Sequence, residues 1–328
     1  MGIDLGGTNV RAAVIDRNER LQGRAEHSSE AKSGALRTVS AIVKAALGAI
    51  SASGISIDQV GAIGLAVPGH IDVPMGMVRW APNFGEMVNG SYVPFKGIPL
   101  RSMLEKELQI AVVMDNDANV AALGEFRYGA GRGTRHLVMF TLGTGIGGGI
   151  IVDGEVLRGA TGGAAEVGHI IIADGKGSSA NGPHGRLETL AGRDAIIERA
   201  ALKMESGRDT LLWKHITGPE ALQQFITPAD IDDAAEEGDA LAIETLQEIG
   251  HFVGLGIASM VNVFNPQMVA LGGKISQSDT LYHSAIRTAR ASSIGSLLAD
   301  ARIERATLAD DAGIMGASEL AWRETLRE

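Results

Sequence analysis

The sequence predicts an α/β fold built from two similar halves. Short apolar runs that suit strands alternate with segments of helical spacing, which is the sequence pattern of an α/β protein. The stretch FTLGTGIGGGIIVDG, residues 140–154, has the same outline as MGIDLGGTNVRAAVID at the start of the chain. Residues 4–16 align with residues 141–153, an offset of 137. The chain therefore repeats one structural motif.

The individual elements follow in order along the chain. We predict strands in GIDL, VRAAVID, VGAIGLAV, IAVVMD, HLVMFTL, GIIVDG and QMVALGG, and several are apolar at consecutive positions, as in strands covered on both faces. Helical spacing predicts a helix through Leu36, Val39, Val43, Ala46, Leu47 and Ile50. Residues 239–265 predict a longer helix that stops at Asn265-Pro266.

The repeat also suggests a division into domains. A chain of 328 residues suits about two domains. We expect a small N-terminal α/β lobe over residues 1–113 and a larger α/β lobe over residues 114–312. The final segment, AGIMGASELAWRETL, has apolar residues at helical spacing. We expect this helix, residues 313–328, to pack back on the first lobe.

Composition excludes several classes of protein. A net charge of −10 without a Lys or Arg cluster argues against nucleic acid as a partner. The chain has no cysteine, which excludes disulfides, iron–sulfur clusters and thiolate zinc sites. No apolar run reaches the roughly 20 residues that span a membrane, and the first strand follows Met1 directly. We therefore expect no membrane contact, no signal peptide and a cytoplasmic location.

The two glycine-rich runs suit an anion. Without Cβ atoms, DLGGT and TLGTGIGGG can bring backbone N–H groups against phosphate. The alternative is that the glycines only serve chain geometry in two hairpin turns. Neither run is a P-loop or a dinucleotide fingerprint, because each leads into a strand instead of a helix.

Several motifs together resemble one known family. They are GIDLGGTNVRAAVID, GLAVPGHID, APNFG, DNDANVAALGEFRYGAG, LGTGIGGGIIVDGEVLRGATGGAAEVGH, RLETLAG, VNVFNPQMVALGG and DAGIMGAS. In this order and spacing they resemble the ROK family of sugar kinases, glucokinases in particular. The resemblance implies two duplicated lobes of the actin-like ATPase and sugar kinase (ribonuclease H-like) fold, with ATP and a hexose in a central cleft. It also implies a homodimer or homotetramer and a role in carbohydrate metabolism and glycolysis.

The resemblance assigns the ATP site to the glycine runs. It implies that phosphate is held by two sets of residues, with Mg²⁺ near Asp4. On the first lobe they are Asp4, Gly6, Gly7, Thr8 and Asn9, and on the second Gly143, Thr144, Gly145, Gly272 and Gly273. Lys274 stands where the family usually has a third glycine.

Asp117 in DNDAN is the expected catalytic base. A carboxylate near a sugar hydroxyl can take its proton while the oxygen attacks the γ-phosphate of ATP. Spacing alone favours a helix cap instead, because Asn116, Asp117 and Asn119 precede the apolar AALGEF.

The same resemblance implies a hexose site. Its expected residues are Gly69, Asn83, Asn116, Glu166, His169 and Glu188. Carboxylates and amides suit paired sugar hydroxyls. Without the resemblance, His169 beside an isoleucine run reads as an ordinary strand histidine and Glu188 as part of a solvated helix face.

These residues indicate an ATP-dependent kinase acting on the 6-hydroxyl of glucose. A kinase for N-acetylmannosamine, N-acetylglucosamine, mannose or fructose remains an alternative, as does polyphosphate as the donor. A non-kinase ATP-binding regulator is a further alternative. We expect no family repressor, because the first strand begins at Gly2 with no helix-turn-helix before it, and no reductase activator, because the chain lacks cysteines.

The loop before Glu188 departs from the family pattern. ROK kinases commonly bind zinc here through the histidine of the GH pair and three cysteines. The cysteine positions hold Ser179, Asn181 and Arg186, and His184 falls where the family has no ligand. We therefore expect no zinc. Either Arg186 partly replaces the ion beside Glu166, Glu188 or a carbonyl, or its side chain points to solvent.

Overall fold

The chain forms two compact units of packed strands and helices. A computed structural model describes residues 1–328 except 17, 174–177, 180–181, 184, 219–220 and 327–328. Unit 1 comprises residues 1–133, 149–165 and 308–328, and unit 2 comprises residues 134–148 and 166–307. The lobe limits expected from the sequence, 1–113 and 114–312, stay a prediction.

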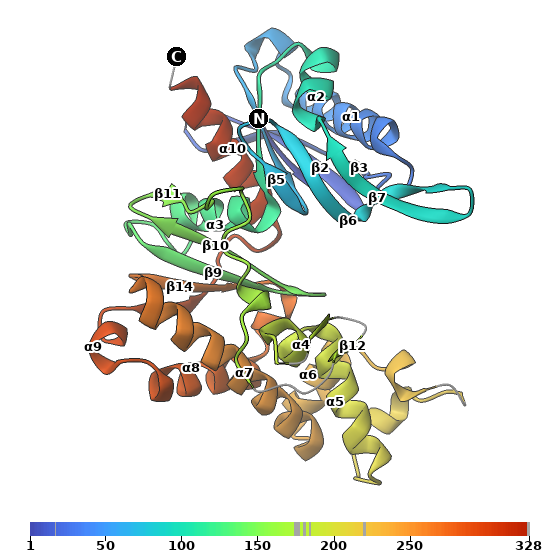
Figure 1. The fold of residues 1–328 in the computed structure, drawn as a ribbon, viewed down its shortest axis with the longest axis vertical. Coiled ribbons are helices and arrows are strands. Elements are labelled where there is room, and N and C mark those ends of the chain that lie inside the picture. Colours follow the sequence, from blue (N-terminus) through green and yellow to red (C-terminus); the bar gives the residue numbers. More distant parts are fainter. Residues whose placement is uncertain (17, 174–177, 180–181, 184, 219–220, 327–328) are drawn as a thin grey trace. The chain divides into compact units, whose positions relative to one another are not determined.

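Unit 1 is built on a mixed sheet with the strand order β3-β2-β1-β4-β8, of which Figure 1 labels β2 and β3. Its strands are β1 (Gly2–Leu5), β2 (Asn9–Ile15), β3 (Leu21–Ser28), β4 (Ile63–Val67) and β8 (Val112–Asn116). A second sheet has the order β5-β6-β7, with β5 (His70–Asp72), β6 (Met77–Val88) and β7 (Ser91–Ile98). The helices are α1 (Ala35–Ser53), α2 (Leu100–Leu108), α3 (Asp117–Tyr128) and α10 (Ala312–Thr325). Short 3₁₀ turns are η1 (Ile57–Gln59) and η6 (Ala309–Asp311).

Helices cover both faces of the main sheet in unit 1. Alternation along β2 sends Ala12 into the same hydrophobic core as Ile42 of α1, and Ala13 into a cluster with Ile314 of α10. Close packing of α10 requires glycine on the strands: a Cβ on Gly64 of β4 would lie 2.7 Å from the carbonyl carbon of Ala317. The C-terminal helix therefore packs directly on β1 and β4.

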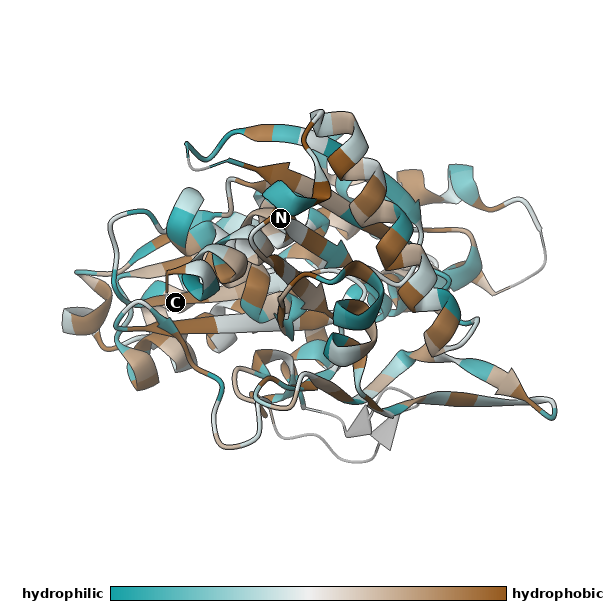
Figure 2. Cartoon of the chain, turned by 90° about the horizontal axis from the view of Figure 1, so that it is seen from above, coloured by the Kyte–Doolittle hydropathy of each residue, from teal (hydrophilic) through white to brown (hydrophobic). Residues whose placement is uncertain are grey.

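Helix α1 is apolar and long enough to cross a membrane by length and composition. Its apolar face is nevertheless occupied, because Val39, Ala41, Ile42, Ala45, Ala46, Ala49 and Ile50 are buried in the core of unit 1. Complete burial of a side chain such as Ile42 contributes about 1.5–3 kcal/mol to folding. Figure 2 shows such hydrophobic residues in brown along the strands and helices, whereas many loops are teal. The helix is thus a core helix of unit 1.

Unit 2 contains a parallel set of strands and a group of helices. Strand β14 (Met268–Gly272) lies between β9 (Leu137–Leu142) and β15 (Arg302–Arg305) and is parallel to both. The short strands β12 (Ser178–Ser179) and β13 (Gly182–Pro183) pair antiparallel to each other. The helices are α4 (Leu187–Ala191), α5 (Arg193–Glu205), α6 (Pro228–Glu236), α7 (Ala240–Phe264), α8 (Asp279–Ser292) and α9 (Gly295–Leu298). The 3₁₀ turns are η2 (Val167–His169), η3 (Leu211–His215), η4 (Leu222–Gln224) and η5 (Lys274–Gln277).

Local sequence signals fix the ends of α7. The side chain of Asp239 caps its start by accepting a hydrogen bond from the amide of Ala242 at 2.8 Å. Its end is a left-handed Asn265, after which Pro266 cannot continue the helix. The helix expected over residues 239–265 is therefore confirmed.

The repeat seen in the sequence is present in the strands. Strands β1 and β2 span Gly2–Leu5 and Asn9–Ile15. At the offset of 137 residues, β10 (Ile146–Val152) has the same limits as β2, and β9 ends where β1 ends but begins two residues earlier. Strand β10 begins in unit 2 and ends in unit 1, where it pairs with β11 (Glu155–Val156). Each half of the chain thus builds a glycine turn between two strands.

Candidate functional site

Three parallel strands of unit 1 end at the same edge of the sheet. Strand β4 lies between β1 and β8, with Asp4 opposite Ala66 and Ala66 opposite Asp115. With strands about 4.8 Å apart, Asp4 and Asp115 lie roughly 10 Å from each other. The turn after β1, Gly69 after β4 and Asp117 after β8 follow these carboxyl ends. Carboxyl ends of parallel strands are where α/β proteins bind ligands.

Asp4 lies in a crowded, partly buried position. Its Oδ2 pairs with Nη2 of Arg11, the register partner on β2, at 2.5 Å. Burial raises the pKa of Asp4, the Arg11 guanidinium opposes that shift, and the Asp310 carboxylate adds to it. A Cβ on Gly313 would lie 2.7 Å from the Asp4 carboxyl carbon, so glycine is required there. A second cation beside Asp4 would stabilise the ionised carboxylate, which burial disfavours.

The turn after β1 is open. The amide of Gly6 donates to the carbonyl of Asn9 at 2.8 Å, which closes the hairpin. A Cβ on Gly7 would meet no described atom within 4 Å, and Gly7 does not have a positive φ. Neither packing nor backbone strain within the described residues therefore requires glycine at this position. The missing Cβ leaves space for a ligand beside the backbone.

The start of α3 shows which residue caps the helix, a role that the sequence left open between Asn116 and Asp117. Asn116 is the cap: its Oδ1 accepts from the amides of Ala118 and Asn119, and its Nδ2 donates to the carbonyl of Gly69 at 3.0 Å. Asp117 is the first residue of the helix, and its Oδ1 also accepts from Ala118. Asn116 and Gly69 are thus brought together, with Asn116 serving a structural role.

The strand β6 passes beside the same turn. A Cβ on Gly69 would lie 2.9 Å from the side chain of Ala81, and the positive φ of Gly69 also favours glycine. Asn83 follows on β6 and is exposed. Gly69, Asn116 and Asp117 therefore lie at the carboxyl edge of the sheet, and Asn83 is two residues beyond the contact of β6 with Gly69.

An ion pair that we did not predict lies under the start of α3. Asp115 is 1% exposed, and its Oδ2 lies 2.7 Å from Nε of Arg158, which is half-buried. Its Oδ1 accepts from the amide of Asn116 and from Nδ2 of Asn119. The sequence contains one signal for this ion pair, which is an aspartate two residues before the expected base. Nothing in the sequence pattern indicated Arg158 as its partner.

Unit 2 brings its own two glycine segments together. Strands β9 and β14 are parallel neighbours, with Gly272 opposite Thr141. The backbone of Gly273, at φ 85°, packs against Leu142, the last residue before Gly143. Among the described residues, a Cβ on Gly143 would meet only one carbonyl oxygen, at 4.0 Å. At Gly143 this turn is therefore open, as the turn after β1 is at Gly7.

Glu188 lies against the second glycine turn. It stands in the first turn of α4, and its Oε2 accepts from the amide of Ile146 at 2.8 Å. A Cβ on Gly145 would collide with this carboxylate. Glu188 therefore contacts the glycine turn. Spacing alone had allowed it to be part of a solvated helix face.

A third group joins the short turn η2 to the segment before α4. Nη1 of Arg186 lies 2.9 Å from Nδ1 of His169. Nε2 of His169 lies 3.8 Å from Oε2 of Glu166, and Glu166 is 60% exposed. Arg186 thus contacts His169 in an exposed position, and it does not pair with Glu166 or Glu188, the carboxylates considered from sequence. Of the other loop positions, Asn181, His184 and the side chain of Ser179 lie outside the described residues.

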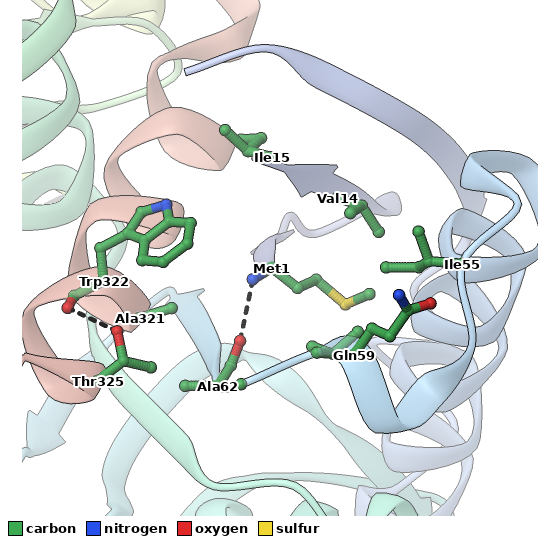
Figure 3. Close-up of a pocket in the computed structure, with 11 residues that line it drawn as sticks. Met1, Val14, Ile15, Ile55, Gln59, Ala62, Ala321, Trp322 and Thr325 are labelled. Carbon is green, nitrogen blue, oxygen red and sulfur yellow. Dashed lines mark hydrogen bonds between the residues drawn. The ribbon is translucent and has the colours of Figure 1, made fainter. Parts of the chain in front are cut away.

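A separate pocket lies at the opposite end of β1. Figure 3 shows Met1, Val14, Ile15, Ile55 and Trp322 around it, with the nitrogen of Met1 donating to the carbonyl of Ala62 at 2.9 Å. Because it lies at the amino end of β1, it is not part of the candidate site.

The duplicated hairpins and the acidic strand ends define the class of protein: the fold is the two-lobed actin-like fold of sugar kinases. The chain belongs to the ROK family, whose model matches residues 1–324. A glucokinase of Halalkalibacterium halodurans is 32% identical over 322 residues, which cover 96% of this chain and 92% of that protein. A xylose repressor of Caldicellulosiruptor bescii is 33% identical over 227 residues, 69% of this chain and 53% of the repressor.

Solved structures agree with this assignment. A ROK hexokinase from Thermus thermophilus superposes with a TM-score of 0.80 at 30% identity, covering 100% of this chain and 99% of that one. A ROK glucokinase from Streptomyces griseus, solved with glucose and AMPPNP, has a TM-score of 0.79 at 30% identity and covers 98% of both chains.

Proposed function

We propose that this protein is an ATP-dependent hexose kinase that transfers the γ-phosphoryl group to the 6-hydroxyl of glucose. The observation that carries the proposal is the carboxyl edge of unit 1, where Asp4 and an open glycine turn lie at the end of β1 and Asp117 follows β8, with the parallel strand β4 between them. The similarity to glucokinases over nearly the whole chain supports it.

Asp117 would act as the general base. Because Asn116 caps α3, the Asp117 carboxylate has a fixed place at the start of the helix. There it can accept the proton of the attacking hydroxyl, a role that contributes typically 10²- to 10⁴-fold to rate. The helix start also suits negative charge.

Backbone groups would hold the phosphates of ATP. Gly6, Gly7, Thr8 and Asn9 would act from unit 1, and Gly143, Thr144, Gly145, Gly272 and Gly273 from unit 2. Mg²⁺, when bound beside Asp4 and the phosphate oxygens, neutralises charge that develops during transfer. The open Cβ positions of Gly7 and Gly143 support this role.

The hexose would be bound by the remaining polar groups. Glu166, His169 and Glu188 would contact its hydroxyls from unit 2, and Gly69, Asn83 and Asn116 would line the site from unit 1. In this proposal the protein acts in the cytoplasm, in the glycolytic use of carbohydrate, as a homodimer or homotetramer without nucleic acid or membrane partners.

A coupled assay over a panel of sugars tests the proposal. We expect the highest kcat/KM for glucose with ATP as donor, compared with mannose, fructose, N-acetylglucosamine and N-acetylmannosamine. Polyphosphate is tested as the alternative donor in the same assay. A higher kcat/KM for another sugar would reassign the substrate, and no turnover of any hexose would overturn the kinase proposal in favour of a regulator.

A further inference from the structure

The contact between Arg186 and His169 restricts where the imidazole carries its proton. Their Nη1 and Nδ1 atoms are 2.9 Å apart. A guanidinium has only donors and stays protonated, so Nδ1 must accept with its lone pair. A neutral imidazole carries one N–H, which then lies on Nε2.

Backbone pairing holds the two side chains in place. On either side of Arg186, the amide of Leu187 donates to Ile170 at 3.0 Å and the amide of Ile172 donates to Gly185 at 2.9 Å. The histidine directly precedes this ladder. The backbone of two paired segments therefore places Arg186 and His169 close enough for their side chains to meet.

The other ring nitrogen, Nε2, has no hydrogen-bond partner among the described residues. Nε2 of His169 lies 3.8 Å from Oε2 of Glu166, which is beyond hydrogen-bond distance. The His169 side chain is 46% exposed, so Nε2–H can reach a ligand.

We propose that Arg186 is a positioning residue that holds His169 as the Nε2–H tautomer, so that Nε2 donates to a hydroxyl oxygen of the hexose. The tautomer follows from the contact alone. The hydroxyl as its acceptor rests on the proposed function.

The same contact makes the site unsuitable for zinc. A histidine binds zinc through a ring lone pair, and the Nδ1 lone pair is engaged by Arg186. The guanidinium cannot itself be a ligand, and the chain has no cysteine. Among the described residues, no three potential ligands are grouped together. Arg186 supplies positive charge at the imidazole, where the family commonly has an ion.

Nuclear magnetic resonance tests the tautomer directly. With ¹⁵N-labelled histidine, long-range ¹H–¹⁵N spectra distinguish a protonated ring nitrogen from a bare one, and His169→Gln assigns the signal. We expect a protonated Nε2 and a bare Nδ1 in the wild-type protein, and a mixture of tautomers in Arg186→Ala. Arg186→Lys should restore the wild-type pattern in part, and Arg302→Ala, at an exposed arginine of β15, should leave it unchanged.

Two spectral results would overturn the proposal: a protonated Nδ1 in the wild-type protein, or equal tautomer populations in wild type and Arg186→Ala. The wild-type spectrum decides the first point even if a variant fails to fold.

Kinetics test the link to the hexose. In Arg186→Ala we expect the hexose KM to rise about three- to tenfold with kcat nearly unchanged, because an interaction present in both ground and transition states is weakened. An unchanged KM would refute the positioning role while leaving the kinase proposal intact. Absence of hexose turnover in the wild type would refute the kinase proposal while the tautomer result stands.

Discussion

Arg158 forms an ion pair with Asp115, in which Nε and Oδ2 are 2.7 Å apart. Asp115 lies two residues before Asp117 in the chain. The Asp115 carboxylate is 1% exposed and also accepts from the amide of Asn116. The pair thus supports the point where β8 turns into α3.

Arg158→Ala should destabilise unit 1, because it leaves a buried carboxylate without its cation. Loss of one partner of such a pair costs about 3 kcal/mol. Urea unfolding measures this, with Arg37→Ala on the exposed side of α1 as the control. Arg158→Lys should recover part of the stability. If Arg158→Ala unfolds at the same urea concentration as the control, the pair does not support the fold.

Asp117→Asn should keep the fold and lower kcat by about 10²- to 10⁴-fold, the usual contribution of a positioned base. The hexose KM should change little, because the amide keeps the size of the carboxylate. Steady-state kinetics with the best hexose measure both constants, and Asp58→Asn on an exposed turn is the control. Turnover near the wild-type rate would remove Asp117 as the base.

Gly7→Ala and Gly143→Ala should weaken ATP binding without destabilising the fold. We expect stability within about 0.5 kcal/mol of wild type, because neither Cβ meets a close described atom. The KM for ATP should rise at least about tenfold, because the methyl group occupies phosphate space. Gly64→Ala is the contrast: it should destabilise by about 1–3 kcal/mol through a clash with α10. Unchanged ATP kinetics in both turn variants would show that the turns do not hold phosphate.

Low pH should lower the stability of unit 2, because Glu244 becomes protonated. Hydrogen bonds from Lys203 and then Arg208 lower the pKa of Glu244 from 4.5 to about 2. Because the pKa of Glu244 is lower in the folded state than in the unfolded state, the ionised side chain stabilises the folded state at pH values above 4.5. This contribution is lost as the pH falls from 4.5 towards 2. The effect is modest because the Glu244 side chain is 46% exposed.

Unfolding of Glu244→Gln at several pH values tests this effect. The free energy of unfolding of the variant should fall less between pH 4.5 and 2 than that of wild type, while Glu205→Gln should behave like wild type. Parallel curves for wild type and Glu244→Gln would contradict the assignment.

Removal of zinc should leave activity intact. We expect metal analysis of protein produced with added zinc to find no stoichiometric zinc, because the Arg186 guanidinium engages His169. A zinc chelator should not change turnover when Mg²⁺ is in excess. One zinc per chain, or inactivation that zinc reverses, would contradict this expectation.

The fold class was predictable because its signals are local. Apolar runs and the 137-residue repeat gave the strands around both glycine turns, and Asp239 with Asn265-Pro266 gave the limits of α7. The β6 and β7 pair was not predicted, because its many exposed residues and its prolines at 82 and 94 break the apolar alternation that indicates a strand.

The sequence by itself determined which residue types stand at the strand ends, and that no cysteine is available for a metal. It left open whether Asn116 or Asp117 caps α3, and what Arg186 contacts. Only the tertiary structure decided these points. The pairs Arg186 with His169 and Arg158 with Asp115 are 17 and 43 residues apart in the chain. Such pairs depend on how loops and strand ends are brought together by packing, and residue periodicity encodes the faces of helices and strands but not the path of the loops between them.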